Sequence, residues 1–108
     1  MKIKRRRKKK GSARIAAGVA WYRRDQWPRL LEVAEDADEL EETYEGWLQI
    51  ANERFNNFKV PGVLLKKVDV DIEELIAWCA ERGRPVDGSA RSEFVAEKVR
   101  ELAEGGRY

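Results

Sequence analysis

The segment from Gly62 to Gly83, which reads GVLLKKVDVDIEELIAWCAERG, constrains the fold more than any other part of the chain. After the break at Pro61-Gly62 come the β-favouring residues Val63, Leu64, Leu65, Val68 and Val70. Asp71 is then placed to cap a helix, and Glu74 is placed to reach back to it in a capping box. One apolar helical face follows at Ile72, Leu75, Ile76 and Cys79. Since Gly83 suits the left-handed end of a helix, the segment predicts a strand that runs directly into a buried helix.

An earlier strand is predicted over residues 14–22, which read RIAAGVAWY. The larger side chains fall on one face, at Ile15, Ala17, Val19 and Trp21, and the other face holds Ala16, Gly18, Ala20 and Tyr22. Both faces are apolar, as in a strand that is covered on both sides. Because the second face is made mostly of small residues, we expect a helix to approach its backbone closely.

Two helices are predicted between these strands. Pro28 is tolerated only in a first turn, so the first helix should begin at residues 26–28 and reach about residue 35. Residues 36–42 are expected to form an acidic loop, with a continuous helix as the alternative, and Thr43 is the expected cap of the second helix. The apolar face of that helix is predicted to comprise Tyr44, Leu48, Ala51, Phe55 and Phe58, with Trp47 beside them.

A last helix is predicted at about residues 88–104, with Asp87 as its cap and a buried face of Val95, Val99, Leu102 and Ala103. The element order is therefore strand, helix, helix, strand, helix, helix. We expect a single α/β domain over residues 14–108, with a two-stranded parallel sheet and four helices. Because such a sheet leaves two free edges, we also expect a homodimer, formed by edge pairing or by helix packing.

The net charge of +2 hides a strong asymmetry. The basic arm, residues 1–13, is expected to be disordered and carries eight cations, which are Lys2, Lys4, Arg5, Arg6, Arg7, Lys8, Lys9 and Lys10. The rest of the chain then has 14 basic and 20 acidic residues, a net charge of −6. An acidic domain with a basic arm suggests that the two parts meet different partners.

Clustered Lys and Arg attract nucleic-acid phosphates, so these eight cations are the predicted nucleic-acid-binding residues. Since no aromatic side chain is interleaved among them, RNA or DNA should be bound without sequence preference. The alternatives are a solubilising tail or an expression tag, or weak docking on anionic lipid. The rival function is a protein-interaction or oligomerising module in which the arm is incidental.

Eight carboxylates and no cation stand between residues 32 and 45. This acidic patch comprises Glu32, Glu35, Asp36, Asp38, Glu39, Glu41, Glu42 and Glu45. It is either a solvated surface or a surface that pairs with a basic partner, which includes the protein's own arm.

An enzyme is not predicted, because the chain has no histidine and no catalytic signature. Cys79 lies on an apolar helical face and is expected to be buried and inert. The acidic cluster of Asp69, Asp71, Glu73 and Glu74 suits Mg²⁺ or Ca²⁺, but capping and the helix dipole explain it better. The four Trp residues are expected in the core and at its rim. We predict no metal, no cofactor and no small-molecule ligand.

A single cysteine excludes an internal disulfide and suits a reducing compartment. No apolar run is long enough to span a membrane, and the basic start is not followed by the apolar segment of a secretory signal. We therefore expect a cytoplasmic protein that does not contact membranes.

Three stretches carry a resemblance, namely AWYRRDQW, TYEGWL and AWCAERGRPVDGSARSEFVAEKV. With them the chain resembles a group of small bacterial proteins without an assigned function, over most of residues 18–100. The resemblance rests on aromatic and turn positions, not on a catalytic signature. It implies a small α/β domain in the bacterial cytoplasm and no particular activity.

Overall fold

The computed structural model describes residues 15–104, with the side chains of residues 15–102. Its elements are β1 (Ile15–Trp21), η1 (Arg24–Gln26), α2 (Trp27–Val33), η2 (Ala37–Glu39), α3 (Tyr44–Asn57), β2 (Val63–Asp69), α4 (Ile72–Glu81) and α5 (Gly88–Glu104). Two strands and four α-helices occur in the predicted order, so the predicted fold class is confirmed. The predicted acidic loop differs slightly, because it contains the short 3₁₀ turn η2.

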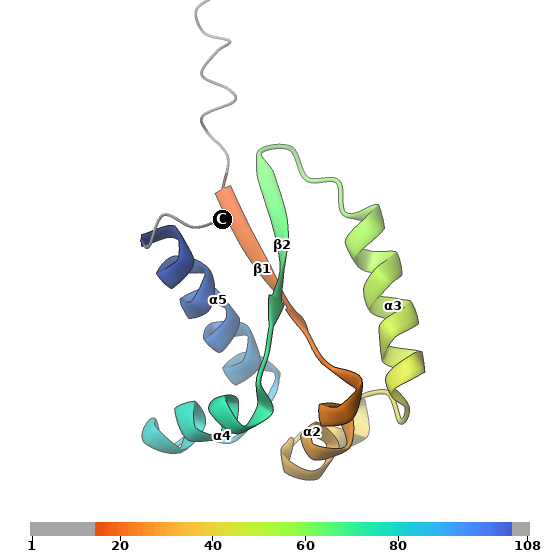
Figure 1. Cartoon of the computed structure of the whole chain (residues 1–108), viewed down its shortest axis with the longest axis vertical. Helices are drawn as coiled ribbons and strands as arrows, with labels where there is room; N and C mark the ends of the chain where they lie inside the picture. Colours follow the sequence, from red (N-terminus) through yellow and green to blue (C-terminus); the bar gives the residue numbers. More distant parts are fainter. Residues whose placement is uncertain (1–14, 105–108) are drawn as a thin grey trace, which may run out of the picture.

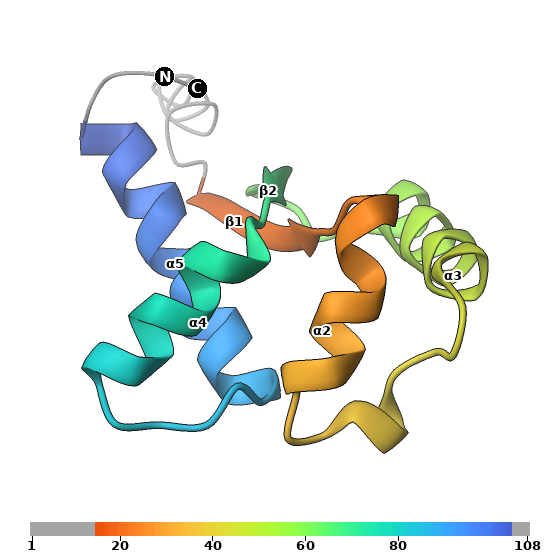
Figure 2. The same ribbon diagram turned by 60° about the horizontal axis from the view of Figure 1, so that its bottom comes forward.

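The two strands pair in parallel, with Ile15 opposite Val63 and Trp21 opposite Asp69. Both strands therefore begin at the same end of the domain, which is the upper end in Figure 1. The helices α3 and α5 run back toward that end on either side of the sheet, while α2 and α4 lie at the opposite end (Figures 1 and 2). We call these the upper and the lower end of the domain.

α5 approaches β1 at Gly18, as the small residues of that strand face predict. A Cβ atom at this position would lie 2.6 Å from Val99 Cγ2 and 2.7 Å from Val95 Cγ1. Real side chains do not approach a Cβ so closely, so only glycine lets the two valines reach the strand backbone. Gly18 thus sets the distance between α5 and the sheet.

The core is built from the sheet, α2, α4 and α5. Its most enclosed side chains are Leu30, Val70, Ile72, Leu75 and Cys79. By contrast, α3 contains no buried residue. The prediction for α5 was wrong at one position, because Leu102 is 43% exposed. It lies in the last turns of α5, close to where the helix ends.

The predicted caps are present at three helix starts. Asp71 Oδ1 accepts a hydrogen bond from the backbone N–H of Glu74 at 3.1 Å, and Thr43 Oγ1 accepts one from Gly46 at 3.0 Å. Asp87 Oδ1 caps α5 through the N–H of Ala90 at 2.9 Å. Gly83 follows α4 with a φ of 60°, in the predicted left-handed conformation.

The capping box at α4 is only half formed. The side chain of Glu74 was predicted to reach back to residue 71, and it makes an ion pair with Lys98 of α5 instead. Long-range pairing has therefore replaced a local hydrogen bond at this position.

Replacing Asp71 with alanine should lower the free energy of unfolding by about 1 kcal/mol, because the first turn of α4 loses its cap. Urea denaturation measures the change. Asp71→Asn retains the capping oxygen and removes the charge, so it should stay close to wild type. Equal losses in both variants would instead assign the effect to the carboxylate charge.

Candidate interaction surfaces

The eight predicted nucleic-acid-binding residues lie outside the described residues, as does the whole of the basic arm, residues 1–13. The described chain begins at Ile15, the first residue of β1. The arm therefore joins the domain at its upper end, where β2 also begins and where α3 and α5 end (Figure 1).

Most cations of the described domain are already paired with carboxylates. The pairs that link separate elements include Arg23–Asp69 at 3.2 Å, Arg29–Glu73 at 2.8 Å, Arg84–Glu93 at 2.8 Å, Arg24–Glu45 and Lys98–Glu74. These pairs also involve Asp69, Glu73 and Glu74 of the acidic cluster considered above for a metal. Since carboxylates outnumber cations, few positive charges remain to attract a polyanion.

Lys67 makes no ion pair with a described residue but lies over the rings of Trp21 and Phe55. Three further cations make no ion pair with any described residue. They are Arg54 in the second half of α3, Lys59 in the loop after it, and Arg100 near the end of α5. All three belong to segments of the upper half of the domain (Figure 1). Glu53 and Glu101, the sequence neighbours of Arg54 and Arg100, also make no ion pair among the described residues, so this end carries unpaired charges of both signs.

The acidic patch lies around η2, toward the lower end. Three of its carboxylates are paired, namely Glu32 with Arg29, Asp36 with Arg91, and Glu45 with Arg24. The other five make no ion pair among the described residues, and they are Glu35, Asp38, Glu39, Glu41 and Glu42. Free carboxylates are thus concentrated around η2, and Arg54 of α3 lines one cavity together with Glu39 and Glu41.

The pair of Asp36 and Arg91 joins the acidic patch to α5. Both guanidinium nitrogens donate to the carboxylate, at 2.9 and 2.8 Å, and the two side chains are only 20% and 11% exposed. Hydrogen bonding from Arg91 holds the pKa of Asp36 below its usual value. A backbone hydrogen bond from Glu35 N to Val86 O reinforces the same junction at 2.8 Å. The position of the acidic patch is therefore fixed.

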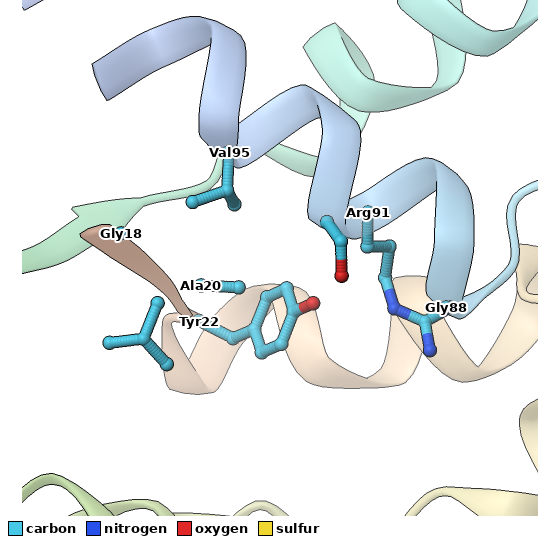
Figure 3. Close-up of a pocket in the computed structure, with 8 residues that line it drawn as sticks. Gly18, Ala20, Tyr22, Gly88, Arg91 and Val95 are labelled. Carbon is cyan, nitrogen blue, oxygen red and sulfur yellow. The ribbon is translucent and has the colours of Figure 1, made fainter. Parts of the chain in front are cut away.

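A groove follows the outer edge of β1. On the side of α5, a cavity of about 340 Å³ is lined by Gly18, Ala20, Arg91 and Val95 among others (Figure 3). On the side of α3, a cavity of about 390 Å³ shares the same stretch of β1, and its walls include Trp47, Ile50, Arg54 and Phe58. We call the two cavities together the β1-edge groove.

An aromatic cluster connects β1, α2 and α3 below this groove. Trp27 and Trp47 are stacked with centroids 5.5 Å apart, and Trp21 meets the edge of Trp47 at 5.3 Å. The hydroxyl of Tyr44 donates to the backbone oxygen of Tyr22 at 2.9 Å. Trp27 is buried and Trp21 and Trp47 are half-buried, which agrees with the predicted core and rim.

Cys79 is buried, as predicted, and burial raises the pKa of its thiol. A raised pKa leaves less of the reactive thiolate. Within residues 15–102, no three side chains of His, Cys, Asp or Glu gather as metal ligands would.

Comparisons with family models, with curated proteins and with solved structures find no match for this chain. None of the helices in the described part has the length and apolarity required to span a bilayer. Sequence reasoning identified the basic arm, the acidic patch and two free sheet edges, but not the cavities beside β1. The uncharged run from Ile15 to Trp21 indicates a strand covered on both faces and gives no sign of cavities along its edge.

Proposed function

We propose that the protein is a small non-enzymatic binding or adaptor protein of the bacterial cytoplasm. Its basic arm contacts RNA or DNA phosphates without sequence preference. The observation that carries the proposal is the pairing of charge in the domain. Carboxylates pair with most of its described cations, and those without an ion pair include Arg54, Lys59, Lys67 and Arg100. Attraction to a polyanion therefore falls to the arm.

The attachment of the arm at the upper end supports one orientation on nucleic acid. Phosphates attract the arm, because the release of counterions by Lys and Arg favours binding. The free carboxylates near η2 are repelled and face away. The domain then projects from the nucleic acid with the aromatic cluster and α4 outermost, as expected of an adaptor.

The rival function, an interaction or oligomerising module, is favoured by the β1-edge groove. An edge strand with free main-chain groups is a ready site for another strand. The two functions are compatible, because the arm and the groove are separate parts of the molecule.

Deleting residues 2–10 should abolish binding to duplex DNA or RNA rather than weaken it modestly, since the remaining protein carries a net negative charge. Filter binding at low salt measures the change. The matched control is the double variant Lys59→Gln, Arg100→Gln in the intact chain, which removes two cations and should weaken binding only a few-fold. If the arm-deleted protein binds nucleic acid as well as the intact protein does, the arm does not contribute to binding. The rival function then replaces this proposal.

A further inference from the structure

The hydrogen bonds of the sheet show which main-chain groups of β1 are left free. The N–H of Ile15 donates to the oxygen of Gly62 at 2.7 Å, and the N–H of Val70 donates to the oxygen of Trp21 at 3.1 Å. In a parallel ladder, alternate residues point toward the partner strand. The N–H and C=O groups of Ala16, Gly18 and Ala20 therefore point outward, into the β1-edge groove.

The two edges of the sheet differ in a way that selects β1. The β2 edge carries Lys66 and Lys67 in the middle of the strand, and charged side chains on an edge strand discourage pairing. From Ile15 to Trp21, β1 has no charged residue at all. Its outward groups also lie between two cavities with room for the side chains of an added strand.

We propose that the β1 edge pairs with β1 of a second copy of this chain, antiparallel, about a two-fold axis at Gly18. The outward groups at residues 16, 18 and 20 are spaced evenly about Gly18, so the strand is complementary to itself. Gly18 then faces Gly18 of the second copy, and Ala16 faces Ala20 of the second copy. The result is a continuous four-stranded sheet in the order β2-β1-β1-β2.

Charge complementarity favours a second copy of this chain as the partner of β1, and it favours the antiparallel direction of pairing. Near Tyr22 a further cavity beside the groove is lined by Glu39 and Glu41 of the acidic patch, together with Arg54 and with Arg91, which is already paired with Asp36. An antiparallel neighbour brings the start of its own β1, from which its basic arm extends, to this end of the groove. Each arm therefore meets the free carboxylates of the other copy. This inference does not depend on nucleic-acid binding.

Engineered cysteines test both the partner and the register. With the axis at Gly18, Ala17 faces Val19 of the second copy in a non-hydrogen-bonded pair, with Cα atoms about 4.5 Å apart, within disulfide range. A mixture of Ala17→Cys and Val19→Cys proteins should form a covalent dimer on mild oxidation, seen on a non-reducing gel. Each variant alone should crosslink at least ten-fold less, because residue 17 does not face residue 17.

The matched control is a mixture of Leu65→Cys and Lys67→Cys proteins, since these residues are the neighbours of Ala17 and Val19 in the sheet but lie on the β2 edge. It should not crosslink. Light scattering of the unmodified protein should give twice the chain mass of 12.5 kDa at high micromolar concentration. The proposal would be overturned by a monomer mass, by the absence of a crosslink, or by equal crosslinking of the control mixture. A monomer mass would instead favour an extended segment of a different protein as the partner of the β1 edge.

Discussion

Raising the salt concentration from 50 to 200 mM should weaken the binding of the intact protein to duplex DNA by about 10³- to 10⁴-fold. Each phosphate contact contributes about −0.9 to the slope of log affinity against log salt, so eight contacts give a slope of roughly −7. The measured slope should be shallower, because eight neighbouring cations rarely all contact phosphates at once. The acidic patch also competes with phosphates for the same cations.

Filter binding or fluorescence anisotropy at four or more salt concentrations gives this slope. The informative comparison is a chain in which Arg5, Arg6 and Arg7 are replaced by Gln. Three fewer contacts should make the slope shallower by about 2.7. A slope near zero in the intact protein would show that phosphate contacts do not provide the affinity. An unchanged slope in the variant would show that these three arginines make no such contacts.

Replacing Gly18 with valine should lower the free energy of unfolding by about 3 kcal/mol, a large share of the stability of a domain of this size. Even the first added carbon would lie 2.6 and 2.7 Å from methyl groups of Val99 and Val95. β-Branched side chains have few alternative rotamers, so these valines cannot turn aside. α5 must move away from the sheet, which exposes part of the core.

Thermal and urea denaturation measure this loss. The matched control is Ala17→Val, which adds two methyl groups at the preceding residue, on the strand face that points away from α5. It should change stability by less than about 1 kcal/mol. Similar losses in the two variants would mean that crowding against α5 is not the cause.

The elements were predictable from sequence because their signals are local. The caps at Thr43, Asp71 and Asp87 and the end of α4 at Gly83 each depend on a few neighbouring residues. The side-chain partner of Glu74 was not predictable, since Lys98 approaches it from another helix. The exposure of Leu102 likewise depends on how far α5 extends beyond its contacts with the sheet.

α3 shows why an apolar pattern does not fix burial. Its face of aromatic and aliphatic residues predicts a well-covered helix, yet none of its residues is buried. The helix contacts the rest of the domain through the aromatic cluster at Trp47, while its second half lines the open cavity beside β1. Amphipathicity shows which face turns inward, and only the tertiary arrangement shows how far it is covered.

The candidate surfaces divide in the same way. The arm and the acidic patch are runs of charge, so they stand out in the sequence. The placement of free cations near the arm depends on ion pairs between distant residues, such as Arg23–Asp69 and Arg29–Glu73. The β1-edge groove depends on strand order, which places no third strand beside β1.

The register of the sheet has a consequence for synthesis on the ribosome. β1 is synthesised early, but its only strand partner in the described chain begins at Val63. β1 therefore has no strand to pair with while α2 and α3 are synthesised. During that interval an uncharged apolar strand is exposed along both edges, a state that favours aggregation. The eight cations translated just before it repel other nascent chains. The arm is thus placed to protect β1 before the domain exists.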